Sequence, residues 1–211
     1  WRPKSISANE RYLVMCAFSG EVLDHDYRFI VYDREDERVL WDRNLFTGEF
    51  NEPGPAAVAD DGTAAIVQEN NLYVIEPNGE VRFSMLWRET GRRWRRMDMD
   101  AEAEYILGRT AEGRVWLYSG DGELLWEKES PCHEYGGYLG VSPNGEYFAY
   151  ADNHGPHIVD REGTVLFELP ENDAGEQPTW YFPNGVDVAN TGAFVYSIGN
   201  RIHYRPSVSE R

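Results

Sequence analysis

Lysine is nearly absent from this chain: Lys4 and Lys128 stand against eighteen arginines. The 37 acidic residues outnumber the 20 basic ones and give a formal net charge of −17. So acidic a surface disfavours general binding to polyanions, because phosphate contacts need basic side chains, and nucleic acid is not an expected partner. Acidic, lysine-poor surfaces keep proteins soluble at high salt. The balance therefore has two interpretations, a protein of a halophile or an ordinary acidic protein encoded by a GC-rich genome.

Cysteine is also scarce. Cys16 and Cys132 lie 116 residues apart, which predicts free thiols and a reducing, cytoplasmic compartment. No apolar run approaches the roughly 20 residues of a membrane span, and no signal peptide is recognisable. Because the chain begins with Trp1 rather than Met, we expect a trimmed or processed polypeptide, and a secreted form remains an open alternative.

No window carries a helical period, and a repeat of about 43 residues takes its place. A hydrophobic strand recurs at intervals of 43, 43, 41 and 45 residues, ending at Tyr32, Ile75, Tyr118, Val159 and Tyr204. A following strand carries an aromatic residue in each of the first four units, namely Trp41, Phe83, Trp126 and Phe167. A four-stranded unit of this length is typical of one propeller blade, so the repeat predicts an all-β propeller in a single domain, residues 1–211.

Alternation and turn chemistry divide each unit into strands. The third unit is predicted at Met97–Asp100, Tyr105–Gly108, Arg114–Tyr118 and Leu124–Trp126, and the fourth at Leu139–Val141, Tyr147–Tyr150, His157–Asp160 and Val165–Phe167. The predicted blades cover about residues 5–50, 56–90, 97–130, 139–175 and 186–205. The fifth unit ends after its third strand, Arg201–Tyr204. We therefore expect about five blades with the last one incomplete.

Two segments resemble known propeller repeats. The run from Val141 to Tyr147 is similar to the Ser-Pro-Asp-Gly turn that opens many WD-repeat blades. The hairpin Arg114–Trp126 resembles those of quinoprotein-like (PQQ-type) propellers. The resemblance implies the fold over nearly the whole chain and implies no activity. No quinone-binding set is present, so no cofactor is expected.

The predicted long loops all fall on one face of such a propeller, where binding residues favour loops on a rigid scaffold. The loop Arg88–Arg96 is the most unusual, because it is basic in an acidic chain and contains Trp94, with Trp87 directly before it. Arginine beside tryptophan can fork onto carboxylates or stack on flat ligands. The alternative is that these arginines pair with the protein's own carboxylates. The candidate binding residues here are Arg88, Arg92, Arg93, Trp94, Arg95 and Arg96.

Three further candidates lie on the other loops of this face. His133 and Tyr135 belong to a His-Glu-Tyr-Gly-Gly run that is similar to one in prolyl-oligopeptidase propellers, although a glycine-permitted loop also explains it. Trp180 either lines a pocket or caps the core. No Gly-x-Ser-x-Gly elbow is present, so serine-hydrolase machinery is not expected. A metal site is a weaker hypothesis, with scattered candidates at His25, His133, Glu134 and His154.

These observations favour a non-enzymatic binding or interaction module. It would use the long-loop face, with the arginine and tryptophan loop as the anchor for a protein partner or an acidic small ligand. The alternative is an enzyme or sensor with a small-molecule or metal pocket at the central channel. The sequence does not decide the oligomeric state.

Overall fold

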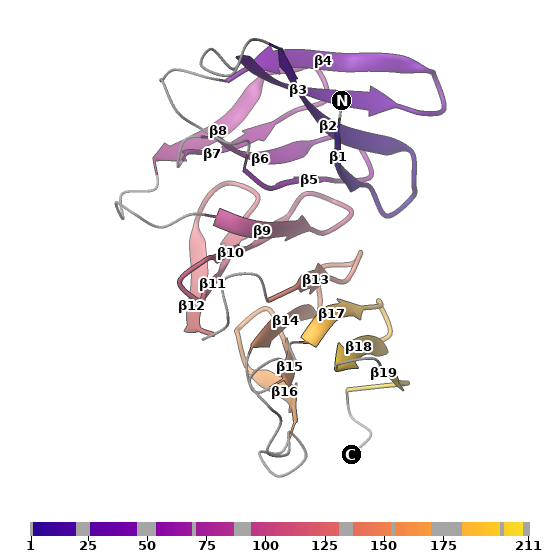
Figure 1. Ribbon diagram of the computed structural model, residues 1–211, viewed down its shortest axis with the longest axis vertical. Helices are drawn as coiled ribbons and strands as arrows, with labels where there is room; N and C mark the ends of the chain where they lie inside the picture. Colours follow the sequence, from indigo (N-terminus) through magenta and orange to yellow (C-terminus); the bar gives the residue numbers. More distant parts are fainter. Residues whose placement is uncertain are drawn as a thin grey trace.

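The computed structural model describes residues 2–19, 26–45, 54–68, 71–86, 94–130, 137–152, 155–169, 183–198 and 201–208. These residues form nineteen strands in five antiparallel sheets, and no helix occurs among them. The sheets follow one another along an arc from the N-terminal to the C-terminal end, and the arc is not closed (Figure 1). The all-β class is confirmed, and successive four-stranded sheets fit a multi-blade propeller.

In each sheet the strands are hydrogen-bonded in sequence order. The first sheet contains β1 (Arg2–Ile6), β2 (Tyr12–Ser19), β3 (Asp26–Asp33) and β4 (Arg38–Asn44). The second contains β5 (Ala56–Val58), β6 (Ala64–Gln68), β7 (Asn71–Ile75) and β8 (Val81–Leu86). The third contains β9 (Trp94–Met99), β10 (Tyr105–Thr110), β11 (Arg114–Ser119) and β12 (Leu124–Glu129).

The fourth sheet contains β13 (Leu139–Val141), β14 (Phe148–Asp152), β15 (Gly155–Val159) and β16 (Val165–Glu168). The fifth has three strands among the described residues, β17 (Pro183–Val188), β18 (Phe194–Ile198) and β19 (Arg201–Arg205). The expected incomplete last unit therefore appears as a three-stranded sheet. The N-terminal residues do not complete it, because β1 pairs with β2 in the first sheet.

The first strand of the third unit is longer than the sequence predicted. It was expected at Met97–Asp100, whereas β9 begins at Trp94 because Trp94 and Arg96 pair with Thr110 and Arg109 of β10. The last three residues of the predicted loop Arg88–Arg96 therefore belong to a strand. A β-bulge between Arg109 and Thr110 lets the pairing continue past the point where the alternation of the sequence breaks.

Serine and asparagine side chains shape the turns between the first and second strands. In the first sheet the Ser7 hydroxyl donates to Asn9 Oδ1 at 2.7 Å and accepts from Tyr12 N at 3.0 Å. Ser142 repeats this arrangement in the fourth sheet, with distances of 2.9 Å to Asn144 Oδ1 and 2.9 Å to Tyr147 N. Such side-chain bonds hold a turn that the strand ladder cannot stabilise. The two turns therefore mark equivalent positions of their sheets.

The repeated aromatic residues pack on glycine turns of the following sheet. A Cβ on Gly79 would lie 3.2 Å from Trp41, one on Gly122 would lie 2.9 Å from Phe83, and one on Gly163 would lie 3.1 Å from Trp126. All three glycines have positive φ, which L side chains rarely adopt. The repeat seen in the sequence is thus a repeated contact between neighbouring sheets.

The core consists of four hydrophobic clusters, one in each interface between consecutive sheets. Stacked sheets of this kind bury apolar side chains from both facing surfaces. Cys16 is a free, buried thiol in the first cluster, and burial raises its pKa. Cys132 lies outside the described residues. Over the part of the chain that the structure describes, no helix has the length and apolarity needed to cross a membrane.

Candidate functional site

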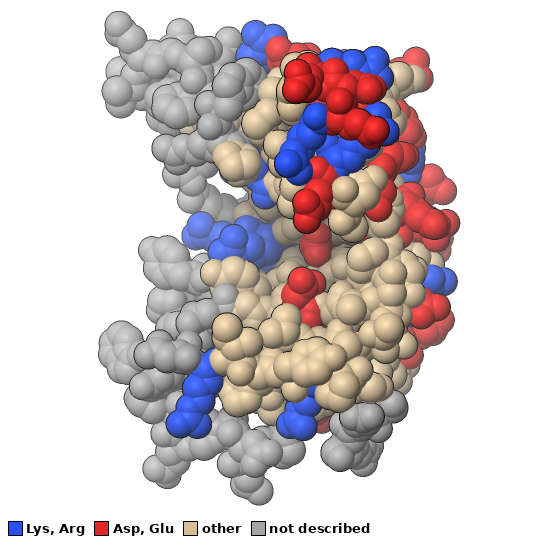
Figure 2. Space-filling view, turned by 90° about the vertical axis from the view of Figure 1, so that its right-hand side faces the viewer, with Lys and Arg blue, Asp and Glu red and all other residues tan. Residues whose placement is uncertain are grey.

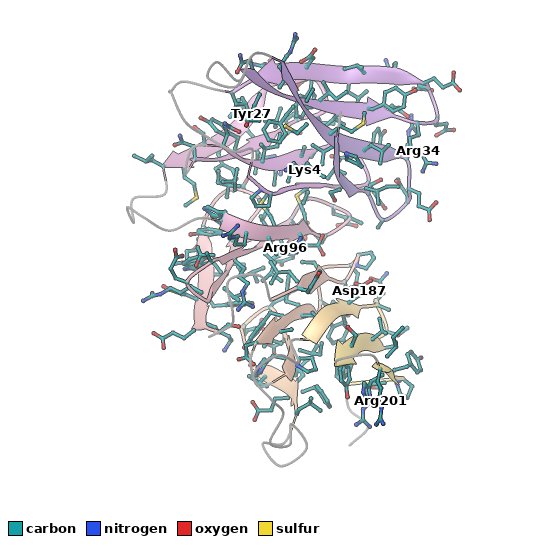
Figure 3. All side chains as sticks on the ribbon, in the orientation of Figure 1. Lys4, Tyr27, Arg34, Arg96, Asp187 and Arg201 are labelled. Atoms are coloured by element: carbon teal, nitrogen blue, oxygen red, sulfur yellow. The ribbon has the colours of Figure 1, made fainter. Side chains whose placement is uncertain are left out.

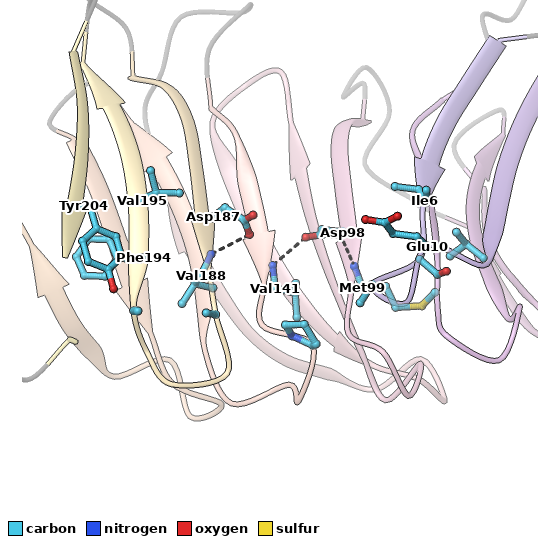
Figure 4. Close-up of a pocket in the computed structure, with 16 residues that line it drawn as sticks. Ile6, Glu10, Asp98, Met99, Val141, Asp187, Val188, Phe194, Val195 and Tyr204 are labelled. Atoms are coloured by element: carbon cyan, nitrogen blue, oxygen red, sulfur yellow. Dashed lines mark hydrogen bonds between the residues drawn. The ribbon is translucent and has the colours of Figure 1, made fainter. Parts of the chain in front are cut away.

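A hollow of about 590 Å³ lies on the inner side of the arc and is lined by described residues. Residues from the inner strands of all five sheets border it (Figure 4). Its lining includes Ile6, Glu10, Asp98, Val141, Asp187 and Tyr204. The hollow extends to the tight turns, with Ser7, Pro143 and Ala189 among its borders. It therefore does not coincide with the long-loop residues that the sequence analysis favoured.

Asp98 bridges two sheets at the edge of this hollow. Its Oδ1 accepts a hydrogen bond from Met99 N at 3.0 Å, and its Oδ2 accepts one from Val141 N of the fourth sheet at 2.8 Å (Figure 4). Packing around the carboxyl raises its pKa to about 7, because desolvation outweighs the two backbone hydrogen bonds and Asp187 adds repulsion. Asp98 can therefore gain or lose a proton near neutral pH.

Two further carboxyl groups of the inner strands are held by backbone hydrogen bonds. Buried Asp100 accepts from Tyr105 N at 2.8 Å, and desolvation raises its pKa to about 6. Exposed Asp187 accepts from Val188 N at 2.8 Å. The described residues contain no group of three or more His, Cys, Asp or Glu that could hold a metal ion. Asp100 thus links the end of β9 to the start of β10, whereas the hydrogen bond of Asp187 stays within β17.

Arg96 lies in the middle of the arc, on β9 (Figure 3). Its side chain is exposed, and its guanidinium lies 4.7 Å from the centre of the Tyr138 ring. Neither Arg96 nor its neighbour Arg95 forms an ion pair with a described residue. The Nε atom of Arg95 is buried and has no hydrogen-bond partner in the described part of the chain. Arg96 is therefore exposed and Arg95 half-buried, and neither has a carboxylate partner among the described residues.

Other arginines of the chain are paired with its own carboxylates. Arg11 contacts Asp33, Glu35 and Asp36, while Arg28 pairs with Asp42, Arg38 with Asp36, Arg82 with Glu76 and Arg114 with Glu127. Figure 2 shows the mixed charges of the first-sheet end and a compact basic group nearer the middle of the arc. The internal charge network proposed as the alternative for the arginine-rich segment thus exists elsewhere in the molecule.

Trp94 was predicted as an exposed binding residue, but its side chain is buried. It is buried in the cluster between the second and third sheets, with its ring centre 5.8 Å from that of Trp116. Its indole fills the space above Gly108. Trp94 is therefore a core residue, because β9 begins three residues earlier than the sequence predicted.

Most of the other predicted site residues lie outside the described residues. This is the case for Arg88, Arg92, Arg93, Tyr135 and Trp180, and for the metal candidates His25, His133, Glu134 and His154. Near the last of these, Asp152 and His157 are described. His157 Nε2 lies 3.1 Å from Asp152 Oδ2, and the imidazole stacks on Tyr150 with ring centres 4.7 Å apart.

Sequence reasoning missed two contacts between the third and fourth sheets, one made by Asp98 and one by Arg109. The segment containing Asp98 was interpreted only as strand alternation, although Asp98 and Asp187 stand at the same distance before the turn in the third and fifth units. That shared position was the available signal. Arg109, fully buried, donates to Ser130 O at 2.6 Å and Ala151 O at 2.5 Å, and no local pattern distinguishes it from a surface arginine.

Comparison with known proteins supports the fold and no function. No protein-family model matches the chain, and no curated protein matches it. A crystal structure of a protein of unknown function from Bacteroides caccae is similar, with a TM-score of 0.52 and 11% sequence identity. The match covers 88% of this chain and 64% of that chain, so this chain spans less than two thirds of the other's length. In all, 1134 solved chains are similar, and a fold this widespread does not identify an activity.

Proposed function

We propose that this chain is a non-catalytic propeller module of the WD-repeat or quinoprotein-like type that binds an acidic partner or ligand through Arg95 and Arg96. The anchor includes the preceding Arg88, Arg92 and Arg93. The proposal rests on one observation: Arg95 and Arg96 have no carboxylate partner among the described residues, in a chain of net charge −17 where carboxylates are abundant. Cations left unpaired in such a chain are suited to an external anion.

The geometry also favours a flat or forked acidic group. The guanidinium of Arg96 lies over Tyr138, and stacking orders the arginine while its N–H groups make no hydrogen bond to the part of the chain that the structure describes. The carboxylate of an acidic side chain matches the two parallel donors of such a fork. The acidic, lysine-poor remainder of the surface suits a halophile's cytoplasm and repels anions that lack a specific anchor.

A matched pair of variants tests this function. Arg95→Ser/Arg96→Ser and Arg28→Ser/Arg38→Ser each change the net charge from −17 to −19, but the second pair removes arginines that already contact Asp42 and Asp36. Binding of a fluorescent poly-glutamate peptide is measured in about 0.1 M salt, where screening acts beyond about 10 Å. The Arg95/Arg96 variant should bind at least about tenfold more weakly, since each charge-assisted contact contributes about 1.5–3 kcal/mol.

The Arg28/Arg38 variant should bind as the unmodified protein does. Equal weakening in both variants would show that net charge alone governs binding and would refute the proposed site. Failure of the unmodified protein to bind the peptide would also count against it. Unfolding by urea, followed in both variants, verifies that the folded state is retained.

A further inference from the structure

The second strands of the five sheets carry one equivalent residue that faces the following sheet. These second-strand residues are Val14, Ala65, Leu107, Ala149 and Val195. Each pairs with the residue of the first, inner strand that lies two places before the turn, and these partners are Ser5, Ala57, Asp98, Gly140 and Asp187 in the same order. The first four of these second-strand residues are fully buried by the next sheet, whereas Val195 is 38% exposed. The outer surface of the fifth sheet is thus an interface surface without its partner in this structure.

The first sheet shows the complementary situation. Val58, Met99, Val141 and Val188 are equivalent inner-strand residues that face the preceding sheet, and all four are buried. Ile6 holds the same position in β1 and is 47% exposed. The identical Ser-x-Asn turns at Ser7 and Ser142 fix this equivalence. In each of the other four sheets this surface packs onto the preceding sheet. In the first sheet the same surface, marked by Ile6, is exposed.

The hydrogen bond from Val141 N to Asp98 joins the third and fourth sheets, and Asp187 is the residue of the fifth sheet in the position of Asp98. Asp187 receives the N–H of the following residue as Asp98 does, but its Oδ2 has no partner among the described residues, whereas Oδ2 of Asp98 accepts from Val141 N (Figure 4). A sheet docked on the fifth would present its own equivalent N–H there. In the first sheet this group is the N–H of Ile6.

Apolar exposure extends across the outer surface of the fifth sheet. Besides Val195, Ile202 is 79% exposed and Tyr204 is 67% exposed on β19. Val195 and Tyr204 border the hollow together with Ile6. Exposed apolar residues gathered on one sheet surface mark an interaction site, and a bare sheet face of this kind favours association.

We propose that the outer surface of the fifth sheet, with Asp187, Val195, Ile202 and Tyr204, docks the first sheet of a second copy of this chain. The first and fifth sheets stand at opposite ends of an open arc, so a second copy supplies the surface that the same molecule does not (Figure 1). In this head-to-tail contact Asp187 Oδ2 accepts from Ile6 N of the second copy. Such a contact joins two different surfaces, so a pair of copies keeps one free fifth-sheet surface and one free first-sheet surface.

Two substitutions with matched controls test the contact. Val195→Glu places a carboxylate in the fifth-sheet surface, and Leu166→Glu is its control on β16, at 37% exposure. Ile6→Glu alters the first-sheet surface, and Val39→Glu is its control on β4, at 48% exposure. Each variant adds the same charge. Mass is measured by sedimentation equilibrium over a range of protein concentrations in high salt, which screens the repulsion between copies.

The unmodified protein and both controls should form species heavier than 24.3 kDa in a concentration-dependent manner. Val195→Glu and Ile6→Glu should each be monomeric at the same concentrations. Each of these two variants retains one intact surface, so their mixture should form a 1:1 dimer that grows no further. A monomeric unmodified protein would overturn the proposal. A mixture that stays monomeric would overturn the head-to-tail arrangement, as would controls that dissociate like the interface variants.

Discussion

The indole of Trp94 occupies the space next to Gly108 so completely that a Cβ built on Gly108 would lie 1.8 Å from Trp94 Cζ3. Trp94 comes from the inner strand β9 and Gly108 from the adjacent β10, and the indole is wedged against Trp116. A tryptophan between two sheets is accommodated here because one strand position lacks a side chain. The packing of Trp94 between the second and third sheets therefore depends on the absence of a side chain at Gly108.

Gly108→Ala is therefore expected to lower the free energy of unfolding by about 2–4 kcal/mol, because the added methyl group must displace a packed indole. Urea unfolding followed by tryptophan fluorescence measures this change. Gly185→Ala is the matched control in a strand, since the nearest heavy atom to a Cβ there is Ser197 Oγ at 3.8 Å. The control should change stability by less than about 0.5 kcal/mol. A similar loss in both variants would contradict the role assigned to Trp94.

Asp33 should contribute more to stability than other carboxylates of the first sheet. It is fully buried, contacts Arg11 through two hydrogen bonds of 3.0 and 2.7 Å, and accepts from Glu35 N and Asp36 N. Asp33→Ala should destabilise the protein clearly more than Asp42→Ala, which breaks the exposed pair with Arg28. Thermal melts of the two variants decide this, and equal midpoints would refute the ranking.

Asp33 also predicts a loss of stability in acid. The hydrogen bond from Arg11 lowers its pKa from 3.8 to about 2, so the unfolded state binds more protons than the folded state between these values. Stability should consequently fall as the pH decreases from about 4 to about 2. This dependence should be weaker in Asp33→Ala. An unchanged acid limb in that variant would show that other carboxyl groups produce it.

The opposite dependence is expected above pH 4 from Asp98 and Asp100. Their pKa values are raised from 3.8 to about 7 and about 6, so the folded state binds more protons than the unfolded state between about pH 4 and 7. Stability from these groups is therefore full below about pH 4 and is lost as the pH rises through about 7. Urea unfolding at pH 5 and pH 8 should show a smaller difference for Asp98→Asn than for the unmodified protein. Asp121→Asn, in an exposed turn, controls for the loss of one charge.

High salt should stabilise the fold. A net charge of −17 produces self-repulsion that the compact state concentrates, and screening relieves it. The melting temperature in about 2 M potassium chloride should exceed that in about 0.05 M, where the Debye length is several times longer. Equal melting temperatures would contradict the halophilic interpretation of the composition.

The strands of this protein could be predicted because alternating side chains and turn residues recur within each unit. Turns such as Ser142–Gly145 and the alternation in β11 give nearly the observed bounds, since they depend on neighbours in sequence, whereas β12 begins as predicted at Leu124 and continues three residues past the predicted end, to Glu129. The repeated aromatic residues are also visible in the sequence, whereas the contacts that they make are not. That Trp41, Phe83 and Trp126 lie on glycine turns of the next sheet is a contact between units, which periodicity alone does not specify.

The candidate site was harder to predict, because burial and pairing depend on residues distant in sequence. A run of arginines and tryptophan looks like one exposed loop, yet Trp94 is core and Arg96 is surface. Two positions apart, they would share one face of a regular strand, and the β-bulge where they pair with Thr110 and Arg109 breaks that alternation. Asp98 and Asp187 are alike in sequence and in their backbone hydrogen bonds. Only the tertiary structure separates them, since a neighbouring sheet covers Asp98 and supplies Val141 N, while none of the sheets that the structure describes covers Asp187. The sequence by itself determined an acidic, repetitive all-β chain, and the stacking of its sheets decided which of its equivalent residues are buried and which remain open to a partner.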